Sequence, residues 1–248
     1  MKTGLLTDRG RRRIKNEDYI KGINDINLYL LADGVGGNRS GEIASKETVE
    51  TFAKYIKLRY KDLNDENELI KLLEEGIIFV NNKIYNLANS KEDYQGMATT
   101  FVYVLIRDNT AYVGNIGDSR AYLIHNNEII QITDDHTYVN ELVKAGMITK
   151  KEASKHSKKN IITRAIGAED KVIMDLYTLP VEDEDIIILC SDGLYDELSD
   201  KKICKTAVEN EDMQACANIL IKDANNHGGN DNVSAICIKI MEDNEKNE

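Results

Sequence analysis

Apolar and polar positions follow two different patterns along this chain. Short apolar runs closed by turn residues predict strands, at residues 28–32, 100–106, 111–113, 121–124, 129–132, 186–190 and 233–240. Other segments repeat apolar residues at helical spacing, and each predicts a helix with one buried face. These segments are residues 49–56, 69–80 and 217–224.

The order of these elements favours an α+β fold over a doubly wound parallel sheet. The strand-like runs between residues 97 and 132 are joined by short connections, which suit antiparallel hairpins better than crossover helices. A polar, lysine-rich stretch with a weak helical pattern follows at residues 136–162. We expect this stretch to be an excursion from the sheet.

No segment of the sequence has the composition of an interdomain linker. Pro180 is the only proline, and no Gly/Ser-rich or Pro-rich stretch occurs. We therefore expect a single domain over residues 1–241, large enough to bury a core without disulfides. The acidic, polar end at residues 242–248 is expected to be disordered.

Charge and cysteine usage narrow the class of protein. Lys and Arg number 32 against 43 Asp and Glu, a net charge of −11, which argues against binding to nucleic acid. No apolar run is long enough to cross a bilayer. The four cysteines, Cys190, Cys204, Cys216 and Cys237, form no Cys-x-x-Cys pair and are expected in the core. We expect a cytoplasmic monomer without a membrane partner.

Acidic residues stand at the ends of four predicted strands. Asp33 and Asp192 each follow an apolar run directly and precede a glycine, Asp118 follows Gly117, and Asp231 precedes the run at 233–240. Each one alone reads as an ordinary turn residue. Gathered at one end of a sheet, the four carboxylates would repel one another unless a cation were present. An all-oxygen ligand set favours Mg²⁺ or Mn²⁺ over zinc.

The segment after Asp33 joins a strand to a helix through glycines. Gly34, with Gly36 and Gly37, would let the backbone approach a metal closely, and the Gly34 carbonyl is itself a candidate ligand. We expect Ser40 to cap the following helix at its N-terminus. On local grounds a flexible connecting loop explains the same glycines equally well.

Basic and acidic residues lie together near the N-terminus. Arg11, Arg12 and Arg13 precede Asn16-Glu17-Asp18, and a guanidinium beside a carboxylate site suits a phosphate dianion. Taken alone, the segment reads as a solvated basic turn. The signatures of thiolate phosphatases, P-loop proteins, protein kinases and His-Glu-x-x-His metalloproteases are missing from the sequence.

Seven sequence blocks in this order resemble one family, the metal-dependent serine/threonine protein phosphatases of the PP2C (PPM) type, in their compact bacterial form. The blocks are Arg13 with Asn16-Glu17-Asp18, Asp33-Gly34-Val35-Gly36-Gly37, Gly96-Met97-Ala98-Thr99-Thr100, Gly117-Asp118-Ser119-Arg120, Asp135-His136-Thr137, Ser191-Asp192-Gly193 and Asp231-Asn232. The resemblance implies a four-layer α-β-β-α sandwich, with two central antiparallel sheets flanked by helices.

The resemblance also implies a site for two Mn²⁺ or Mg²⁺ ions. By motif, Asp33 would bridge both ions, Asp192 and Asp231 would complete the first site, and the Gly34 carbonyl would serve the second. Asp118 with Asp192 matches a third, weaker metal site.

The remaining matched residues surround that site. Glu17 and Asp18 would hold metal-bound waters, and Arg13 matches the phosphate-binding arginine. The stretch at 138–163 corresponds to the variable flap of the family, where His156 is a candidate substrate contact or an ordinary surface histidine.

The implied reaction is direct attack of a metal-bridging hydroxide on phosphoserine or phosphothreonine, without a phosphoenzyme. The implied substrates are phosphorylated proteins, with a cognate bacterial Ser/Thr kinase as the natural partner. Val35 stands where eukaryotic members carry a histidine, so leaving-group protonation would fall to metal-bound water. Ala98 replaces a usual glycine, which we interpret as a mild packing change.

Two other functions use similar residues. A non-catalytic phosphoprotein binder of this family would be expected to lose metal ligands, whereas Asp33, Asp192 and Asp231 are all present. A metal phosphodiesterase or nuclease would act on a polyanion, which the net charge of −11 disfavours.

Overall fold

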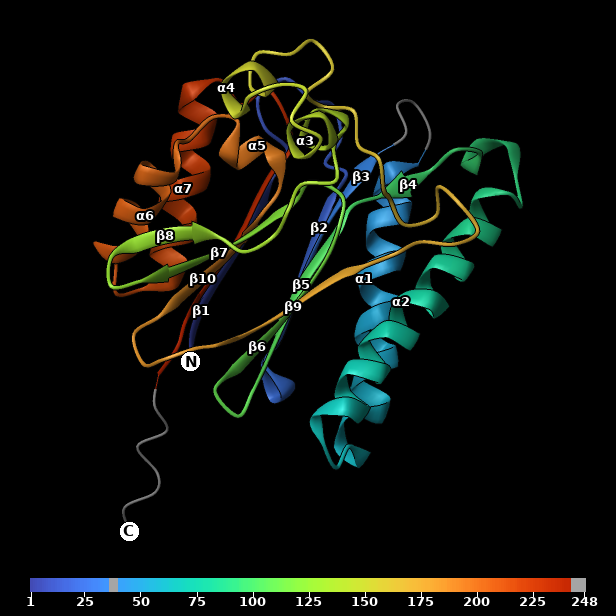
Figure 1. Ribbon diagram of the computed structural model, residues 1–248, viewed down its shortest axis with the longest axis horizontal. Coiled ribbons are helices and arrows are strands. Elements are labelled where there is room, and N and C mark those ends of the chain that lie inside the picture. Colours follow the sequence, from blue (N-terminus) through green and yellow to red (C-terminus); the bar gives the residue numbers. More distant parts are fainter. Residues whose placement is uncertain (36–39, 242–248) are drawn as a thin grey trace.

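The computed structural model describes residues 1–35 and 40–241, and antiparallel sheets form its centre (Figure 1). The strands of the first sheet are β1 Lys2–Asp8, β7 Arg120–His125, β8 Glu128–Gln131, β10 Ile186–Cys190 and β11 Val233–Lys239. Those of the second are β2 Asp18–Ile23, β3 Leu28–Val35, β4 Ala98–Thr99, β5 Phe101–Arg107, β6 Thr110–Ile116 and β9 Asp175–Pro180. Their orders are β1-β11-β10-β7-β8 and β2-β3-β5-β6-β9, with β4 paired to β3.

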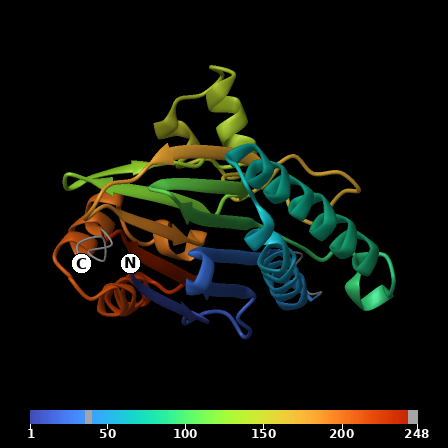
Figure 2. The ribbon, with the colours of Figure 1, turned by 90° about the horizontal axis from the view of Figure 1, so that it is seen from below.

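Helices cover the outer face of each sheet, which confirms the sandwich. The long helices α1 Gly41–Arg59 and α2 Glu66–Ala88 cover one side. On the other side lie α5 Asp192–Tyr195, α6 Asp200–Val208 and α7 Met213–His227. Short 3-10 turns occupy Asn24–Ile26, Tyr60–Asp62 and Glu92–Tyr94. The helices α3 Tyr138–Lys144 and α4 Lys150–Ala153 project beyond the sheets (Figure 2).

Three apolar clusters separate the four layers. Successive residues of a strand point to opposite faces, so β3 contributes to two of these clusters. Leu28 and Leu30 pack with α1 and α2, whereas Tyr29 and Leu31 pack between the two sheets. A third cluster lies beneath α5, α6 and α7. Burial of β3 on both faces explains why its apolar run is continuous in the sequence.

The expected hairpins form at two places and fail at a third. β5 and β6 pair through Asp108 and Asn109, and β7 and β8 through Asn126 and Asn127, all four residues with positive φ. Such residues suit the tight two-residue hairpin turn. β6 and β7, however, belong to different sheets, so the chain crosses between the sheets around Asp118.

Several local expectations are settled within the described residues. All four cysteines are free and buried, as expected. Helix α1 begins directly after Ser40, but the prediction that this side chain caps the helix is wrong. Ser40 has a φ of 65° and its Oγ donates instead to the Asp93 carbonyl at 3.2 Å.

Two predicted features fall on residues that the structure does not describe. Gly36, Gly37 and the tail at 242–248 lie outside the described residues. Within residues 1–35 and 40–241, the helices all fall short of the length and apolar character needed to span a bilayer.

Candidate functional site

A cavity of about 390 Å³ brings together nearly all of the predicted site residues. Its lining consists of Arg13, Glu17, Asp33, Gly34, Val35, Asp118, Asn160, Ile162, Asp192, Asp231 and Asn232. Of the predicted residues only Asp18 and His156 are absent from this lining. We call it the catalytic cavity.

The pairing of β2 with β3 positions the first two acids. Asp18 lies directly opposite Asp33 in the antiparallel register. The Gly34 N–H donates to the Glu17 carbonyl at 3.0 Å, which fixes the preceding loop to the end of β3. A Cβ atom on Gly34 would lie 2.4 Å from backbone atoms of Gly41. Glycine is therefore required here because α1 starts against this backbone.

The pairing of β10 with β11 positions the next two acids. Asp192 begins α5 just after β10, and Asp231 lies just before β11. The two connections pack tightly, since a Cβ on Gly193 would lie 2.0 Å from the Asn232 carbonyl oxygen. Asp118 reaches the same cavity from the crossing between the sheets.

The carboxylates of the catalytic cavity carry uncompensated charge. Burial raises the pKa of Asp33 well above its ordinary value, and Asp18, Asp192, Asp118 and Asp231 raise it further by repulsion. The pKa of Asp192 rises for the same reasons, burial first. Burial, followed by Asp135, raises the pKa of Asp118 to about 7. A cation would relieve this repulsion.

Two buried oxygens in this cluster have no hydrogen-bond partner. Asp18 Oδ2 accepts from Ser191 Oγ at 2.7 Å and from Ser234 Oγ at 2.6 Å, yet its Oδ1 is unpaired. Asp192 Oδ1 is unpaired as well. An orphaned buried acceptor is costly in free energy, and both oxygens fit a role beside a metal ion.

The carboxylates surround the cavity rather than meet at one point. Within the described part of the chain, no three His, Cys, Asp or Glu side chains stand close enough to enclose one ion by themselves. Asp192 and Asp231 raise the pKa of Asp33, and Asp231 raises the pKa of Asp192. The three carboxylates are therefore close enough to repel one another. This all-oxygen set spread around a small cavity fits hard divalent ions whose coordination is completed by water and phosphate.

Arg13 is tied to the rim of the catalytic cavity. Its Nη2 lies 2.6 Å from Asp231 Oδ2, and half of its side chain, 51%, is exposed. The guanidinium is therefore both oriented by the site and open to an incoming anion.

Asn232 is a structural residue of the site to which the sequence analysis assigned no role. Its Oδ1 accepts from the Glu17 N–H, and its Nδ2 donates to the carbonyls of Arg9 and Lys15, all at 2.8 Å. One amide thus holds both ends of the loop that carries Arg13. Its position directly after Asp231 was the available sequence signal.

His156 lies in the projecting segment and away from the catalytic cavity. Its ring is 6.2 Å from that of Tyr138, and its Nδ1 accepts from the Lys158 N–H at 3.1 Å. Asn160, which the sequence analysis did not single out, lines the cavity from the same segment. A substrate contact by His156 stays a prediction.

Comparisons with known proteins identify the family. The family model for protein phosphatase 2C matches residues 8–222. The protein phosphatase PhpP of Streptococcus pneumoniae is 37% identical over 246 residues, which cover 98% of this chain and 99% of PhpP.

Solved structures give the same result. The serine/threonine phosphatase of S. agalactiae has a TM-score of 0.89 at 36% identity, covering 96% of this chain and 98% of that one. The catalytic domain of PstP, solved with two manganese ions, has a TM-score of 0.84 at 32% identity, covering 97% and 98%. The chain belongs to the protein phosphatase 2C family and is a serine/threonine protein phosphatase.

Proposed function

We propose that this phosphatase removes phosphate from phosphoserine and phosphothreonine by direct attack of water on phosphorus, with no phosphoenzyme. The observation that carries the proposal is the set of buried, mutually repelling carboxylates around one small cavity, two of them with unpaired oxygens. This arrangement is costly for the protein alone, and two Mn²⁺ or Mg²⁺ ions would stabilise it.

The proposed ligand roles follow the family motif. Asp33 would bridge both ions, Asp192 and Asp231 would complete the first site, and the Gly34 carbonyl would serve the second. When bound, the ions would lower the pKa of an attacking water and neutralise charge on the phosphoryl group. Asp118 with Asp192 would hold a third, weaker ion, which the raised pKa of Asp118 supports.

Glu17 and Asp18 would orient water around the ions. Asp18 suits this role because two serine hydroxyls fix one of its oxygens and leave the other unpaired. Glu17 borders the cavity, and burial raises the pKa of its carboxyl.

Arg13 would bind the substrate phosphate. In the structure its guanidinium pairs with Asp231, one of the carboxylates that would hold an ion, and half of the Arg13 side chain is exposed to an incoming phosphate. Arg offers paired donors that match phosphate oxygens. Stabilisation of the transferring group by Arg13 would be about 2–4 kcal/mol, by analogy with a lost oxyanion donor.

Leaving-group protonation would fall to water in the cavity. Val35 lines the cavity where a histidine would otherwise be the natural proton donor, and it cannot donate. Val35 lies opposite Ala98 in the pairing of β3 with β4.

The biological substrates would be phosphoproteins, with a cognate Ser/Thr kinase among them. Relatives of this chain carry the names serine/threonine phosphatase and protein phosphatase, which supports a protein substrate. The net charge of −11 supports it over a nucleic acid substrate.

The test is phosphate release from a phosphothreonine peptide with Mn²⁺, with Mg²⁺ and with excess chelator. We expect metal-dependent turnover by the wild type and none by Asp192→Ala. Asp25→Asn is the matched control, because Asp25 is an exposed aspartate paired with Lys57 at 2.9 Å, outside the cavity. A folded wild type that binds Mn²⁺ but releases no phosphate would contradict the proposal.

A further inference from the structure

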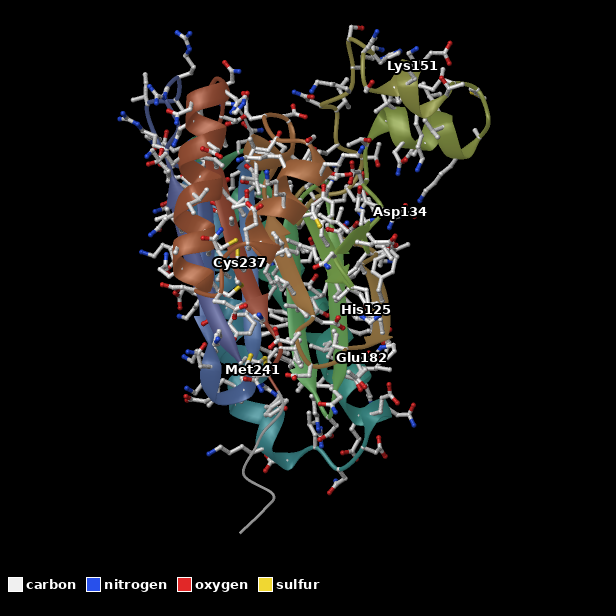
Figure 3. The ribbon with its side chains drawn as sticks, turned by 90° about the vertical axis from the view of Figure 1, so that its left-hand side faces the viewer. His125, Asp134, Lys151, Glu182, Cys237 and Met241 are labelled. Atoms are coloured by element: carbon white, nitrogen blue, oxygen red, sulfur yellow. The ribbon has the colours of Figure 1, made fainter. Side chains whose placement is uncertain are left out.

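A second and larger cavity, of about 550 Å³, lies beneath the projecting segment at 138–163. Asp118, Asn160 and Asp192 line both this cavity and the catalytic cavity, so the two cavities are adjacent. Figure 3 shows the segment, with Lys151, standing away from the sheets, and Asp134 below it. We call the segment the flap and the second cavity the flap cleft.

The acids of the flap cleft differ in how firmly they are paired. Arg120 binds Asp135 through two nitrogens, at 2.9 and 2.7 Å, and its guanidinium lies 3.6 Å from the centre of the Tyr195 ring. Asp134 pairs with Lys144 at 2.9 Å, but both side chains are more than half exposed, so this pair is weak. Arg120 and Asp135 are largely buried, with side chains 21% and 16% exposed, so this pair is a fixed wall of the cleft.

Asp196 also has an exchangeable partner, and it directly follows α5, whose first residue Asp192 lines the catalytic cavity. Lys159, at the end of the flap, places its Nζ 2.6 Å from Asp196 Oδ2. Their side chains are 40% and 37% exposed. Exposed ion pairs of this kind contribute roughly 0–1 kcal/mol, so another cation can replace Lys159 at little cost.

The charges of the cleft leave Asp196 as an acceptor for a cation. The lining holds five aspartates, one arginine and two lysines, but Asp118 and Asp192 are proposed metal ligands and Asp135 is paired with Arg120. Asp118 is only 7% exposed and faces both cavities. The ammonium group of Lys159 shows that this position beside Asp196 accommodates a cation.

We propose that the flap cleft is a specificity subsite for a lysine or arginine side chain of the phosphoprotein, with Asp196 as its acceptor in place of Lys159. The proposal rests on the phosphatase function proposed above. With the phosphoryl group in the catalytic cavity, the neighbouring basic side chain of the substrate enters the cleft. Lys159 then turns out to solvent.

The test compares phosphothreonine peptides that differ at one position. Lysine, alanine or glutamate is placed in turn at each of the three residues before and after the phosphothreonine. At one or two positions we expect kcat/KM for lysine to exceed that for alanine by at most about 5-fold, because an exposed pair contributes at most about 1 kcal/mol and displacement of Lys159 offsets part of it. The preference should weaken at high salt, because both partners are exposed.

Two variants locate the preference in the cleft. Asp196→Asn should bring the lysine-to-alanine ratio close to one, whereas Lys159→Ala should raise the ratio by vacating the acceptor. Asp25→Asn and Lys155→Ala are the matched controls, an exposed aspartate outside both cavities and an exposed lysine of the flap. Both controls should keep the wild-type ratio. Because the lysine-to-alanine ratio compares two peptides with the same variant, any general change in activity or folding cancels.

Several outcomes would overturn the subsite. They are equal turnover of all peptides, a preference for glutamate, or a lysine preference that survives Asp196→Asn. Asp196→Asn is also assayed with p-nitrophenyl phosphate. If this variant changed the Mn²⁺ requirement and the wild type showed no peptide preference, Asp196 would act on metal binding and the subsite would be refuted. If instead the wild type hydrolysed neither peptides nor p-nitrophenyl phosphate, the proposed function itself would fail.

Discussion

Gly117 and His136 exchange two hydrogen bonds where the flap leaves the body of the protein. The Gly117 N–H donates to His136 Nδ1 at 3.1 Å, and the His136 N–H donates to the Gly117 carbonyl at 2.9 Å. Nε2 therefore carries the proton, which it donates to Asp175 at 3.0 Å. The Thr163 N–H donates to the His136 carbonyl at 2.8 Å. One neutral histidine thus connects both ends of the flap to the loop that carries Asp118.

Replacement of this ring is expected to weaken metal activation. His136→Phe keeps an aromatic ring but leaves the Gly117 N–H without a partner, at a cost of about 1–3 kcal/mol in the free energy of unfolding. Since Asp118 is next to Gly117, we expect the Mn²⁺ concentration for half-maximal activity to rise roughly 10-fold. A titration of p-nitrophenyl phosphate turnover against Mn²⁺ measures the shift.

His136→Asn is the control for that prediction. Its side-chain oxygen can accept in place of Nδ1, so the Mn²⁺ requirement should return part of the way to the wild-type value. A loss of stability in His136→Phe without any change in Mn²⁺ requirement would show that His136 supports the fold alone.

Removal of the Arg13 guanidinium should weaken phosphate binding and slow turnover. We expect Arg13→Ala to lower kcat/KM for a phosphothreonine peptide roughly 100- to 1,000-fold, as for the loss of a transition-state donor. Inhibition by inorganic phosphate should weaken in parallel. Arg13→Lys should recover little, because an ammonium group cannot offer the paired donors.

Arg11→Ala is the matched control for Arg13→Ala. Arg11 lies in the same basic run, but its Nη2 donates to Asn226 Oδ1 at 2.8 Å rather than to an acid of the cavity. Near-wild-type kinetics are expected. An equal loss of activity in both variants would indicate a general electrostatic effect instead of a specific contact.

Neutralisation of Asp192 should stabilise the metal-free protein while abolishing activity. Asp192→Asn removes a buried carboxylate that repels Asp118, Asp231 and Asp18, so the Tm in chelator should rise by a few degrees. The rise in Tm that Mn²⁺ gives the wild type should be lost. Differential scanning fluorimetry with and without Mn²⁺ tests both statements, and a lower Tm in chelator would contradict the first.

The same repulsion makes stability depend on pH in the metal-free protein. Asp118 has a pKa of about 7 in the fold against an ordinary value of 3.8, so the folded state binds more protons than the unfolded chain. Stability is therefore full below the unfolded value and is lost as pH rises through the folded value. From pH 6.5 to 8.5 in chelator, the free energy of unfolding should fall by roughly 1–3 kcal/mol, with Asp33 and Asp192 contributing in the same direction.

Urea unfolding at the two pH values, with chelator and with Mg²⁺, checks this slope. Mg²⁺ should flatten it, because the ion needs the deprotonated carboxylates. Asp118→Asn should reduce the slope in chelator. His136 works in the opposite sense, since burial lowers its pKa and protonation of the unfolded chain costs stability as pH falls. A metal-free protein that is more stable at pH 8.5 than at pH 6.5 would contradict the raised pKa of these carboxyl groups.

The close backbone contact at Gly34 predicts that a side chain there would destabilise the fold. Gly34→Ala would place a methyl group 2.4 Å from Gly41, so the start of α1 must move away from β3. We expect a loss of at least about 2 kcal/mol in stability and no Mn²⁺-dependent activity. Gly96→Ala is a control for the glycine change itself, because a Cβ there meets no atom within 4 Å. Because Gly96 has a φ of 79°, alanine also strains the backbone there, and Gly34→Ala should still lose more stability than Gly96→Ala.

The local pattern of the sequence predicted the inner part of the fold. Residues 28–32 and 186–190 are continuous apolar runs because β3 and β10 are buried on both faces. β1, β2 and β9 were missed because polar residues and glycines interrupt their apolar positions, so no continuous apolar run marks these partly buried edge strands. Partial burial leaves a weak pattern, which local reasoning cannot separate from a loop.

Strand ends and family motifs predicted most of the catalytic cavity for a physical reason. An acid that directly precedes or follows a buried strand is recognisable in the sequence because the apolar run marks the strand. Asp33, Asp192 and Asp231 could therefore be named in advance, and all three line the cavity. Asn160 was not singled out because it reaches the cavity from the flap, and no local pattern encodes that approach.

The sequence by itself therefore determined the buried strands, the family and the acids available for metal ions. Only the tertiary structure decided which sheet each hairpin joins, that His136 holds the loop of Asp118, and that Lys159 lies on Asp196 beside the catalytic cavity. The physical reason is that periodicity and motifs report on neighbours along the chain. These contacts join residues 19 and 37 positions apart, and packing of separate layers brings them together.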